Sequence, residues 1–513
     1  MLRTLRNLFR LVVIARTLAR HDALFIFNAH PVGNVVIKVA NFIWRRRQKS
    51  SRRPGERLAK ALTELGPSFI KLGQAISTRP DLLGDALTTD LSQLQDRLPA
   101  FPFSEVKASI EKDFERPLKK VFRSIDRQAV AAASIAQVHF AVTTEGQEAA
   151  VKVLRPGIKE AFAKDLDLFY WLAELVNLTQ PKIRRLRPLD VVRKLEETVL
   201  TEMDLRFEAA AAEELAENFS DDLDFVVPAV DWQRTTEHVL TLERMSGHRI
   251  DTAKDLAEMG LDPTLIVRLA AEIFFKMVFR DGFFHADMHP GNLFITKDGK
   301  IIAMDFGIMG RVDRTTRKIL GEMLLGFVTR DYNKVAEVHI RAGYVPTHKS
   351  IEAFAQACRS IAEPILGRPM NEISLARLLG QLFQITEKFE MEIQPQLLLL
   401  QKSMLLTEGV GRKLAPDVNM WELARPMIEN WMRSELGPEA KVRDILSDAA
   451  ASLEKLPHMV DKLGSAAEQI RGAGLKLHPK TAETLAGKRP SRHWAAWTPW
   501  VLVAMAIAVV AFN

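Results

Sequence analysis

Two short runs hold the side chains whose types and spacing point most directly to a reaction. Phe284–Asn292 reads FHADMHPGN, so Asp287 precedes Asn292 by five residues, and Met304–Gly307 reads MDFG and supplies Asp305. In a phosphoryl-transfer site of the protein-kinase type, the first carboxylate orients the acceptor hydroxyl or water, while the amide and the second carboxylate hold Mg²⁺ against the ATP phosphates. The sequence therefore predicts Asp287 as the catalytic residue, Asn292 and Asp305 as metal ligands, and ATP and Mg²⁺ as cofactors.

The residues between these two runs form a predicted strand pair. Residues 292–295 and 300–304 are apolar after their first residue and flank the turn at 297–299, so Asp305 falls at the end of a strand. Gly307 is expected to let the backbone turn just after the metal ligand. An Asp near an Asn usually marks only a turn, but two such motifs joined by a strand pair rarely arise without function.

Lys152 is the candidate for the lysine that contacts the α- and β-phosphates of the nucleotide. It lies in the apolar run 149–154, which the turn at 144–147 joins to a preceding strand at 137–142. Because side chains alternate along a strand, Lys152 should face away from its two valine neighbours. Such a lysine needs a carboxylate to hold it. The candidates lie on the predicted helical tract 189–219 and are Glu202, Asp204 and Glu208.

No G-x-G-x-x-G loop precedes Lys152, and an alanine-rich run stands in its place. We predict that this run binds the nucleotide. Its candidate contacts are Val130, Ala131, Ala132, Ala133, Ser134, Ile135, Ala136 and Gln137. Alanine enters positive-φ conformations only at a cost, so the phosphate geometry should differ from that of a protein kinase. The alternative is a helix N-terminus, since alanine is a good helix former. Glu243 and Met245, around the end of a predicted strand at 239–243, are further candidates for cofactor contact.

Four further motifs carry a resemblance to a known family. Residues 69–74 (FIKLGQ) are similar to a K-x-G-Q motif, residues 132–139 (AASIAQVH) to an alanine-rich loop, residues 202–204 (EMD) to an E-x-D motif, and residues 94–99 (LQDRLP) to a signature of bacterial members. With these motifs the chain resembles the UbiB family of atypical kinase-like proteins, also called the aarF-domain-containing kinases, over about residues 56–310.

The resemblance implies roles for residues that spacing alone leaves open. Glu208 would be the partner of Lys152. A helical extension would fold over the cleft where a peptide substrate normally binds, and the residues of this regulatory contact would be Lys71, Gln74, Glu202 and Asp204. Lys71 is expected to contact Glu202 and Asp204. A site covered by its own chain suits a small or lipid-like acceptor, or water, better than an extended protein.

The order of predicted elements favours an α+β, two-lobe protein-kinase-like fold, in which a small β-rich N-lobe precedes a large helical C-lobe. The expected divisions are a basic extension at 1–55, a helical extension at 56–120, the N-lobe at 121–245, the C-lobe at 246–440, a helical linker at 441–493 and a transmembrane helix at 494–512. The single cysteine, Cys358, excludes internal disulfides and a cysteine-based zinc site, which fits a reducing compartment.

Both ends of the chain indicate a membrane. The net charge is +7, and arginines recur between apolar residues through residues 1–20, which predicts an amphipathic helix on an anionic lipid surface. A mitochondrial presequence or a solvated basic helix would look similar. Residues 494–512 carry no charge, begin with a tryptophan cluster and follow several cations, so a transmembrane helix with the catalytic body on the cytoplasmic side is expected. A buried terminal helix is the alternative.

The family is associated with ubiquinone biosynthesis and, in bacteria, with the inner membrane. The resemblance therefore implies that ubiquinone intermediates or other ubiquinone biosynthesis proteins are partners, alongside membrane lipid. No nucleic-acid module accompanies the basic residues, so no nucleic acid is expected, and a homodimer is left open.

Three functions compete on this sequence. The first is a Mg²⁺-ATPase or small-molecule kinase supporting ubiquinone synthesis at the membrane. The second is a non-catalytic, nucleotide-gated scaffold that organises biosynthetic enzymes or extracts lipid intermediates, although retention of Asp287 argues against it. The third is an ordinary protein kinase, which should show a glycine-rich loop and an A-P-E segment after Asp305, and neither is evident.

Overall fold

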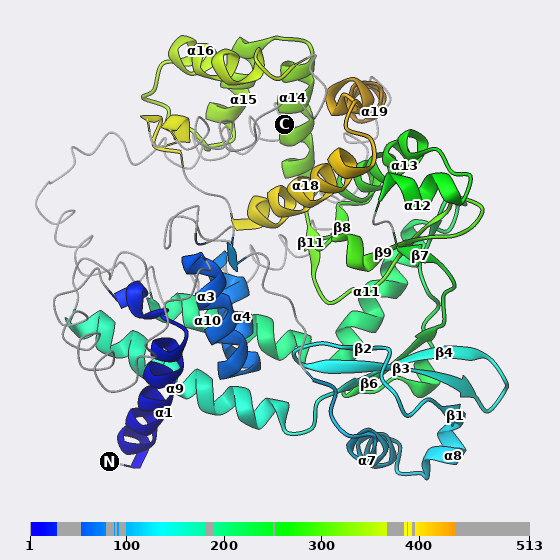
Figure 1. Cartoon of the computed structure of the whole chain (residues 1–513). Coiled ribbons are helices and arrows are strands. Elements are labelled where there is room, and N and C mark those ends of the chain that lie inside the picture. The colour runs from blue at the N-terminus through cyan, green and yellow to red at the C-terminus, as the bar shows by residue number, and fades with distance from the viewer. Residues whose placement is uncertain are drawn as a thin grey trace, which may run out of the picture. The chain divides into compact units, whose positions relative to one another are not determined.

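The computed structural model describes residues 2–27, 53–77, 87, 90–91, 99–179, 188–249, 252–366, 384–386, 388–391 and 395–436. The chain divides into two compact units, Met1–Met432 and Arg433–Asn513, and the elements that carry the polar motifs belong to the first (Figure 1). The predicted linker at 441–493 and transmembrane helix at 494–512 lie outside the described residues. Within the described part of the chain, no helix combines the length and apolar character needed to cross a bilayer.

A five-stranded antiparallel sheet forms the small lobe (Figure 1). Its strands are β1 (Phe122–Ile125), β2 (Ala131–Ala132), β3 (Ala136–Thr143), β4 (Glu148–Leu154) and β6 (Val239–Glu243). The order is β1-β3-β4-β6, with β2 added to β3. The predicted hairpin is confirmed, because β3 pairs with β4 along its length, and Gly146 in the turn has a φ of 93°, which glycine adopts without strain. The alanine-rich run thus contains a short strand, and the alternative of a helix N-terminus is wrong.

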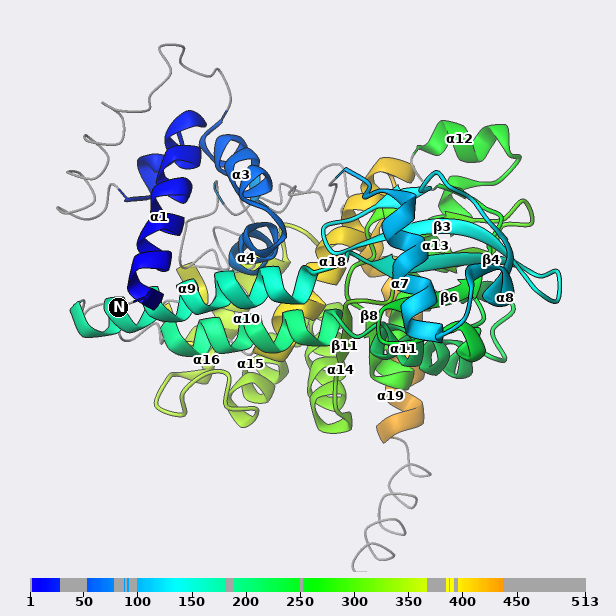
Figure 2. The same ribbon diagram turned by 90° about the horizontal axis from the view of Figure 1, so that it is seen from below.

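The two faces of this sheet pack against different partners. Val151 and Val153 of β4 are fully buried on one face, in a cluster with apolar residues of the helices that cover it. These helices are α7 (Phe103–Phe114) and α8 (Leu118–Val121), and Figure 2 shows α7 lying across the sheet. Lys152 therefore faces the opposite side, as alternation predicts. The predicted orientation of this lysine is confirmed by its bonds, described below.

Three helices connect β4 to the rest of the small lobe. They are α9 (Ile158–Thr179), α10 (Pro188–Glu202) and α11 (Leu205–Asn218), and α9 and α10 lie side by side (Figures 1 and 2). The tract predicted at 189–219 is two helices, because the chain breaks after Glu202. Asp204 caps the second helix by accepting a hydrogen bond from the Arg206 backbone N–H. The helix α9 is absent from the predicted elements, although its buried residues Phe162, Leu166, Phe169 and Ala173 recur at the three- and four-residue spacing of an amphipathic helix.

The N-terminal extension is helical and is tied to the small lobe by ion pairs. Its elements are α1 (Leu2–Arg20), η1 (Leu24–Phe27), α3 (Pro54–Leu65) and α4 (Pro67–Ser77). Three arginines of α1 pair with acidic residues of α9 and α3: Arg6 with Asp167, Arg10 with Asp165, and Arg20 with Glu64. Phe9 and Val12 on the same helix are exposed. The helix is confirmed, whereas its contact with a membrane stays a prediction.

The large lobe is mostly helical and carries short strands at the polar motifs. Its helices are α12 (Ala253–Glu258), α13 (Pro263–Phe275), η4 (Lys276–Asp281), η5 (Pro290–Asn292), α14 (Arg314–Val328), α15 (Tyr332–Arg341), α16 (Ile351–Ala362), α18 (Pro395–Leu414) and α19 (Met420–Leu436). Strands β9 (Leu293–Ile295) and β10 (Ile301–Ala303) form the predicted antiparallel pair, which is confirmed.

The remaining short strands lie before, at the start of and after residues 284–292, the predicted catalytic run. They are β5 (Phe225–Val226), β7 (His248–Arg249), β8 (Phe283–His285) and β11 (Met309–Arg311), and η3 (Trp232–Arg234) precedes β6. Strands β5 and β7 complete the sheet of β10 and β9, in the order β5-β10-β9-β7. Strand β8 pairs with β11. His285, two residues before Asp287, therefore lies opposite Met309, four residues after Asp305. The two motifs are therefore joined through two separate strand pairs.

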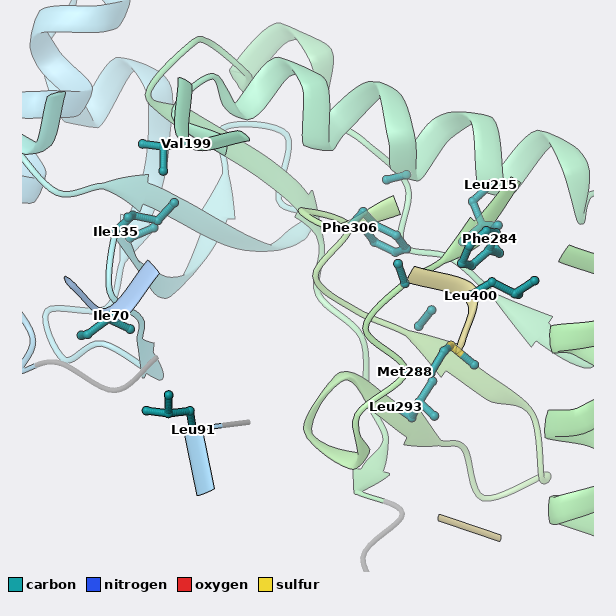
Figure 3. Packing of buried hydrophobic residues seen from close by; sticks show 14 of the residues in the cluster. Ile70, Leu91, Ile135, Val199, Leu215, Phe284, Met288, Leu293, Phe306 and Leu400 are labelled. Atoms are coloured by element: carbon teal, nitrogen blue, oxygen red, sulfur yellow. The ribbon is translucent and has the colours of Figure 1, made fainter. Parts of the chain in front are cut away.

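Apolar residues beneath the polar motifs form one buried cluster. Figure 3 shows Phe284 and Phe306, from the two motifs, lying near Leu215 of α11 and Leu400 of α18. Met288, next to the predicted catalytic Asp, belongs to the same cluster and is 1% exposed. This packing fixes the backbone from which the polar side chains project.

Replacing Gly310 by alanine should destabilise this arrangement. A Cβ atom there would lie 2.2 Å from the Phe284 ring, which is fully buried and cannot move aside freely. We expect the Gly310→Ala change to lower the free energy of unfolding by about 1–3 kcal/mol, the usual cost of overpacking. Urea unfolding followed by circular dichroism measures it.

Gly409→Ala on α18 is the matched control, because nothing lies within 4 Å of a Cβ atom there. It should be neutral or stabilise the protein by about 0.5–1 kcal/mol, since glycine is unfavourable inside a helix. Equal unfolding midpoints for Gly310→Ala and the unsubstituted protein would show that the Phe284 packing is looser than described.

Candidate active site

Lys152 is bonded to two carboxylates that come from different parts of the chain. Its Nζ donates to both oxygens of Glu208, at 2.8 and 2.9 Å, and to Oδ1 of Asp305 at 3.0 Å. Strand β4 supplies the lysine, α11 supplies Glu208, and the segment after β10 supplies Asp305. Of the three carboxylates proposed as partners from the sequence, Glu208 is the one in contact. The structure thus brings together a predicted phosphate-binding lysine, its helix partner and a predicted metal ligand.

The ionisation of this triad follows from burial and mutual charge. The Lys152 ammonium lowers the pKa of Asp305 below its usual range. Burial acts to lower the pKa of Lys152, but the charges of Asp305 and Glu208 outweigh it and hold that pKa above its ordinary value. Burial raises the pKa of Glu208 to about 7, against the opposing charge of Lys152. Near neutral pH the lysine and Asp305 are therefore charged, and Glu208 is the member that titrates.

The backbone of the second motif is left-handed at Asp305 and bends just after it. Asp305 itself has a φ of 61°, in the left-handed region, whereas Gly307 is not among the residues with positive φ. The left-handed residue is therefore Asp305, while the backbone bends at residues 307 and 308, so the turn predicted just after the metal-ligand candidate is confirmed. A Cβ atom on Gly307 would lie 3.4 Å from Asp305 Oδ1 and 4.0 Å from Glu208 Oε2. The missing side chain at Gly307 thus leaves room beside both carboxylates.

Asp287 and Asn292 are joined by hydrogen bonds that the Asn292 side chain donates. The Asn292 side-chain Nδ2 donates to the Asp287 carbonyl oxygen at 3.1 Å and to Asp287 Oδ2 at 3.2 Å. Asp287 is about one-third exposed, so its carboxylate is accessible to a substrate. The structure places these two predicted residues together, while their catalytic and metal-binding roles stay predictions.

His285 joins the two motifs and was given no role on sequence grounds. The Asp287 backbone N–H donates to its Nδ1 at 3.1 Å, so Nε2 carries the proton and donates to the Met304 carbonyl at 3.2 Å. The ring is completely buried, and burial lowers the pKa of His285, which keeps the ring neutral. The sequence feature that could have pointed to His285 is its position two residues before Asp287. This histidine holds the Asp287 segment against the Asp305 segment.

The alanine-rich run presents some of its predicted contacts and buries others. Val130 is 54% exposed, and Ala131 and Ala132 form β2. The Ala133 N–H donates to the Ala136 carbonyl at 2.8 Å and closes a tight turn. The side chains of Ser134, Ile135 and Ala136 are buried, and Ile135 belongs to the same cluster as Ile70 of α4 (Figure 3). Ile135 thus packs in the core, where its side chain serves stability.

The side chain of Gln137 does not face Lys152, which corrects its assignment as a nucleotide contact. In the β3–β4 register, Gln137 lies opposite Val153, on the face that packs against α7, whereas Val138 lies opposite Lys152. Gln137 accepts a hydrogen bond from the Phe101 backbone N–H at 2.8 Å and donates to the Phe101 carbonyl at 3.2 Å. Alternation along the strand was known from the sequence, but the partner at Phe101 was not. The side chain ties residue 101 to the sheet.

The extension reaches the triad through a buried ion pair. Lys71 Nζ of α4 lies 2.6 Å from Glu202 Oε2 at the end of α10, and each side chain is only 10% exposed. Asp204, which was expected to contact Lys71 too, forms a salt bridge with Arg206 at 2.7 Å. Besides Lys152, the charge of Lys71 also lowers the pKa of Asp305, so α4 lies close to the site. Gln74 is half-buried on the same helix.

Glu243 and Met245 lie at and beyond the end of β6, away from the bonds just described. Glu243 is exposed and accepts a 3.4 Å hydrogen bond from the Ala229 backbone N–H. Met245 is half-buried. Nothing in their contacts assigns them to a nucleotide, and their role stays a prediction.

The predicted metal ligands have the chemistry of a Mg²⁺ site. Mg²⁺ is usually held by one or two carboxylates together with phosphate oxygens and water, so one Asp and one Asn suffice when a nucleotide is present. Among the described residues, no group of three His, Cys, Asp or Glu side chains could hold a metal alone. The residues present therefore fit a metal that arrives with a nucleotide.

Two protein-family models match the chain, and together they cover most of the two lobes. A model described as "ABC1 atypical kinase-like domain" matches residues 93–339, and one described as "UbiB helical domain" matches residues 358–419. The first contains Lys152, Glu208, Asp287 and Asp305, and the second contains the whole of α18.

Individual relatives are similar over most of their length. A "Probable protein kinase UbiB" from Marinobacter nauticus is 42% identical over 424 residues, which cover 82% of this chain and 78% of the relative. A protein of the same name from Azotobacter vinelandii is 41% identical, covering 83% and 80%. A solved structure of Rv3197 with erythromycin, from Mycobacterium tuberculosis, has a TM-score of 0.52 at 24% identity and covers 77% of this chain and 96% of that one. This last likeness shows a shared kinase-like fold.

Binding of a Mg²⁺–nucleotide should release a proton from Glu208. Because its pKa is about 7, Glu208 is protonated in much of the free protein at pH 6 and ionised at pH 8. The ionised form holds Lys152 and frees Asp305 for the metal, so affinity for Mg²⁺–ADP should rise from pH 6 to pH 8, by about tenfold at most for one proton. Calorimetry in buffers of different ionisation enthalpy measures both the affinity and the number of protons released on binding.

Glu208→Gln should weaken binding and remove most of this pH dependence. Glu214→Gln is the matched control, since Glu214 lies on the same helix and pairs with Arg311 at the surface. It should keep the pH dependence of the unsubstituted protein. An affinity independent of pH in the unsubstituted protein would contradict the assignment of Glu208 as the titrating group.

Proposed function

The chain belongs to the UbiB family of ABC1 atypical kinase-like proteins, and on that premise we propose that it is a phosphoryl-transfer enzyme that uses Mg²⁺ and ATP. One observation carries the proposal: Lys152 is bonded at once to Glu208 and Asp305. A buried lysine held by one carboxylate is suited to nucleotide phosphates, and the second carboxylate is suited to the metal that accompanies them. Asp287 and Asn292 lie in residues 284–292, which His285 joins to the Asp305 segment.

Each residue of the site has a separate task in this proposal. Lys152 contacts the phosphates while Glu208 keeps it in place. Asp305 and the Asn292 side-chain oxygen hold Mg²⁺, because the Asn292 nitrogen is already used on Asp287. Bound Mg²⁺ neutralises charge that develops on the phosphate oxygens. Asp287 orients the acceptor hydroxyl or a water molecule, and His285 keeps the Asp287 segment beside Asp305.

The acceptor proposed is a small or lipid-like molecule of the ubiquinone pathway, or water. Support comes from the Lys71–Glu202 ion pair, which fixes the extension close enough to the site for Lys71 to influence Asp305. An extension held there by a buried ion pair leaves less space for an extended protein substrate. We place the protein at the bacterial inner membrane with its catalytic body in the cytoplasm, on the pattern of residues 1–20 and 494–512.

A nucleotide-gated scaffold is the second candidate. The same Lys71–Glu202 pair favours it, because an ion pair that bonds the extension to α10 could be made or broken by nucleotide without turnover. The two candidates differ in what Asp287 does. Only the enzyme needs this carboxylate after the nucleotide has bound.

Purified protein lacking residues 494–513 should hydrolyse ATP slowly, and faster with anionic lipid vesicles or a phenolic quinone precursor. Asp287→Asn should lower kcat by about 10²-fold or more, since it removes the group that orients the acceptor, while Mg²⁺–ADP still binds. Phosphate release and calorimetry measure the two properties. If Asp287→Asn binds nucleotide and turns over ATP at the original rate, the enzyme proposal is contradicted and the scaffold is favoured.

Deletion of the gene in a ubiquinone-dependent host should reduce ubiquinone content. The unsubstituted chain should restore it, and Asp287→Asn should not, because the pathway would need the reaction as well as the protein. Quantifying quinones by mass spectrometry measures this. Full rescue by Asp287→Asn would show that ubiquinone synthesis does not need the reaction at Asp287. Normal ubiquinone content in the deletion strain would contradict any role of the protein in that pathway.

A further inference from the structure

Lys402 contacts the predicted catalytic Asp from a helix outside both catalytic runs. Its Nζ donates to Asp287 Oδ1 at 3.0 Å, across a sequence separation of 115 residues. The lysine side chain is 37% exposed and that of Asp287 is 31% exposed, so the pair borders solvent and can be reached by a substrate. Lys402 lies on α18, in the stretch matched by the helical-domain model and not in the kinase-like stretch.

The catalytic run itself supplies no permanent cation to Asp287. Residues 284–292 contain neither lysine nor arginine. His285 is buried and neutral, and both of its ring nitrogens are already bonded. His289 accepts a hydrogen bond from the Gly291 backbone N–H through its Nδ1 at 3.1 Å. Lys152 is held by Glu208 and Asp305. Within the part of the chain that the structure describes, the cation bonded to Asp287 therefore comes from α18.

The position of Lys402 is set by the packing of α18. Leu400, Val410 and Leu414 of this helix are buried in the cluster that also contains Met288, the residue after Asp287. Ser403, the next residue along from Lys402, is completely buried and donates to the Leu399 carbonyl at 2.9 Å. A helix fixed on one face in this way holds its bordering side chains at a defined distance from the catalytic run.

We propose that Lys402 is a positioning residue for phosphoryl transfer. It holds Oδ1 of Asp287 while Asn292 holds Oδ2, so the carboxylate is fixed from both sides. It also offsets the charge of Asp287 beside the nucleotide phosphates. In the reaction, the acceptor oxygen bonds to the γ-phosphorus and its proton passes to Asp287. The bond to the β–γ bridging oxygen breaks, and ADP leaves with that electron pair. The inference rests on the proposed function.

Three variants test the role by kinetics. Lys402→Met should lower kcat for ATP turnover by about tenfold or more, because a misplaced orienting group costs rate, with the KM for Mg²⁺–ATP changed by less than about threefold. Lys402→Arg should recover a substantial part of the loss, since it restores the cation. Lys413→Met, an exposed lysine on the same helix, should match the unsubstituted protein. In an Asp287→Asn background, Lys402→Met should cause no further loss.

The contact itself can be measured without activity. A water-soluble carbodiimide joins a carboxylate and an amine in contact as an amide, with loss of water, and mass spectrometry of the digest identifies the pair. The unsubstituted protein should give an Asp287–Lys402 cross-link, which Lys402→Arg and Asp287→Asn should not give. The Lys349–Glu390 pair, at 2.7 Å, is the positive control.

The outcomes separate this inference from the proposed function. A cross-link with the expected loss of kcat supports the positioning role. Absence of the cross-link while Lys349–Glu390 reacts overturns it, and so does a cross-link with an unchanged kcat in Lys402→Met. In both of these cases ATP turnover by the unsubstituted protein leaves the proposed function standing. Absence of any turnover in the unsubstituted protein overturns the proposed function, and the positioning role falls with it.

Discussion

The ammonium of Lys152, shared between Glu208 and Asp305, is the interaction on which the rest of the site depends. Removing the Lys152 ammonium and the Glu208 carboxylate from water is costly unless their mutual attraction and hydrogen bonds, together with the bond from Lys152 to the half-exposed Asp305, offset that cost. Strand β4, helix α11 and the segment after β10 must therefore be placed together, or a buried charge is left without a partner. The same requirement explains why the sheet turns Lys152 away from the apolar face that holds Val151 and Val153.

A second layer of contacts ties this triad to the rest of the chain. His285 bonds the Asp287 segment to Met304, and the Lys71–Glu202 pair bonds the extension to α10. The break between α10 and α11 lies at Glu202 and Asp204, so one short motif both ends the helix that holds the extension and caps the helix that carries Glu208. Helix α4 is therefore joined to the helix that carries Glu208 through a short connection at Glu202–Asp204.

The sequence predicted the parts of the site that depend on local pattern. Alternation placed Lys152, and the apolar runs gave the hairpin of β3 and β4 and the pair of β9 and β10. Family motifs, and not spacing, selected Glu208 from three carboxylates. Local pattern could not reveal Lys402, because only tertiary packing of α18 brings it to Asp287. Nor could local pattern reveal that Asp305 is left-handed, because glycine is the usual occupant of that conformation. Gln137 was misassigned because its partner Phe101 is distant in sequence.

The central question is whether Asp305 exchanges Lys152 for a metal when nucleotide binds. A crystal structure of the protein with Mg²⁺ and a non-hydrolysable ATP analogue answers it most directly. We expect Mg²⁺ about 2.0–2.1 Å from oxygens of Asp305 and Asn292, with Lys152 still bonded to Glu208 and now also to a phosphate. A bound nucleotide whose metal touches neither Asp305 nor Asn292, or a Lys152 that has left Glu208, would contradict the site proposed for this chain.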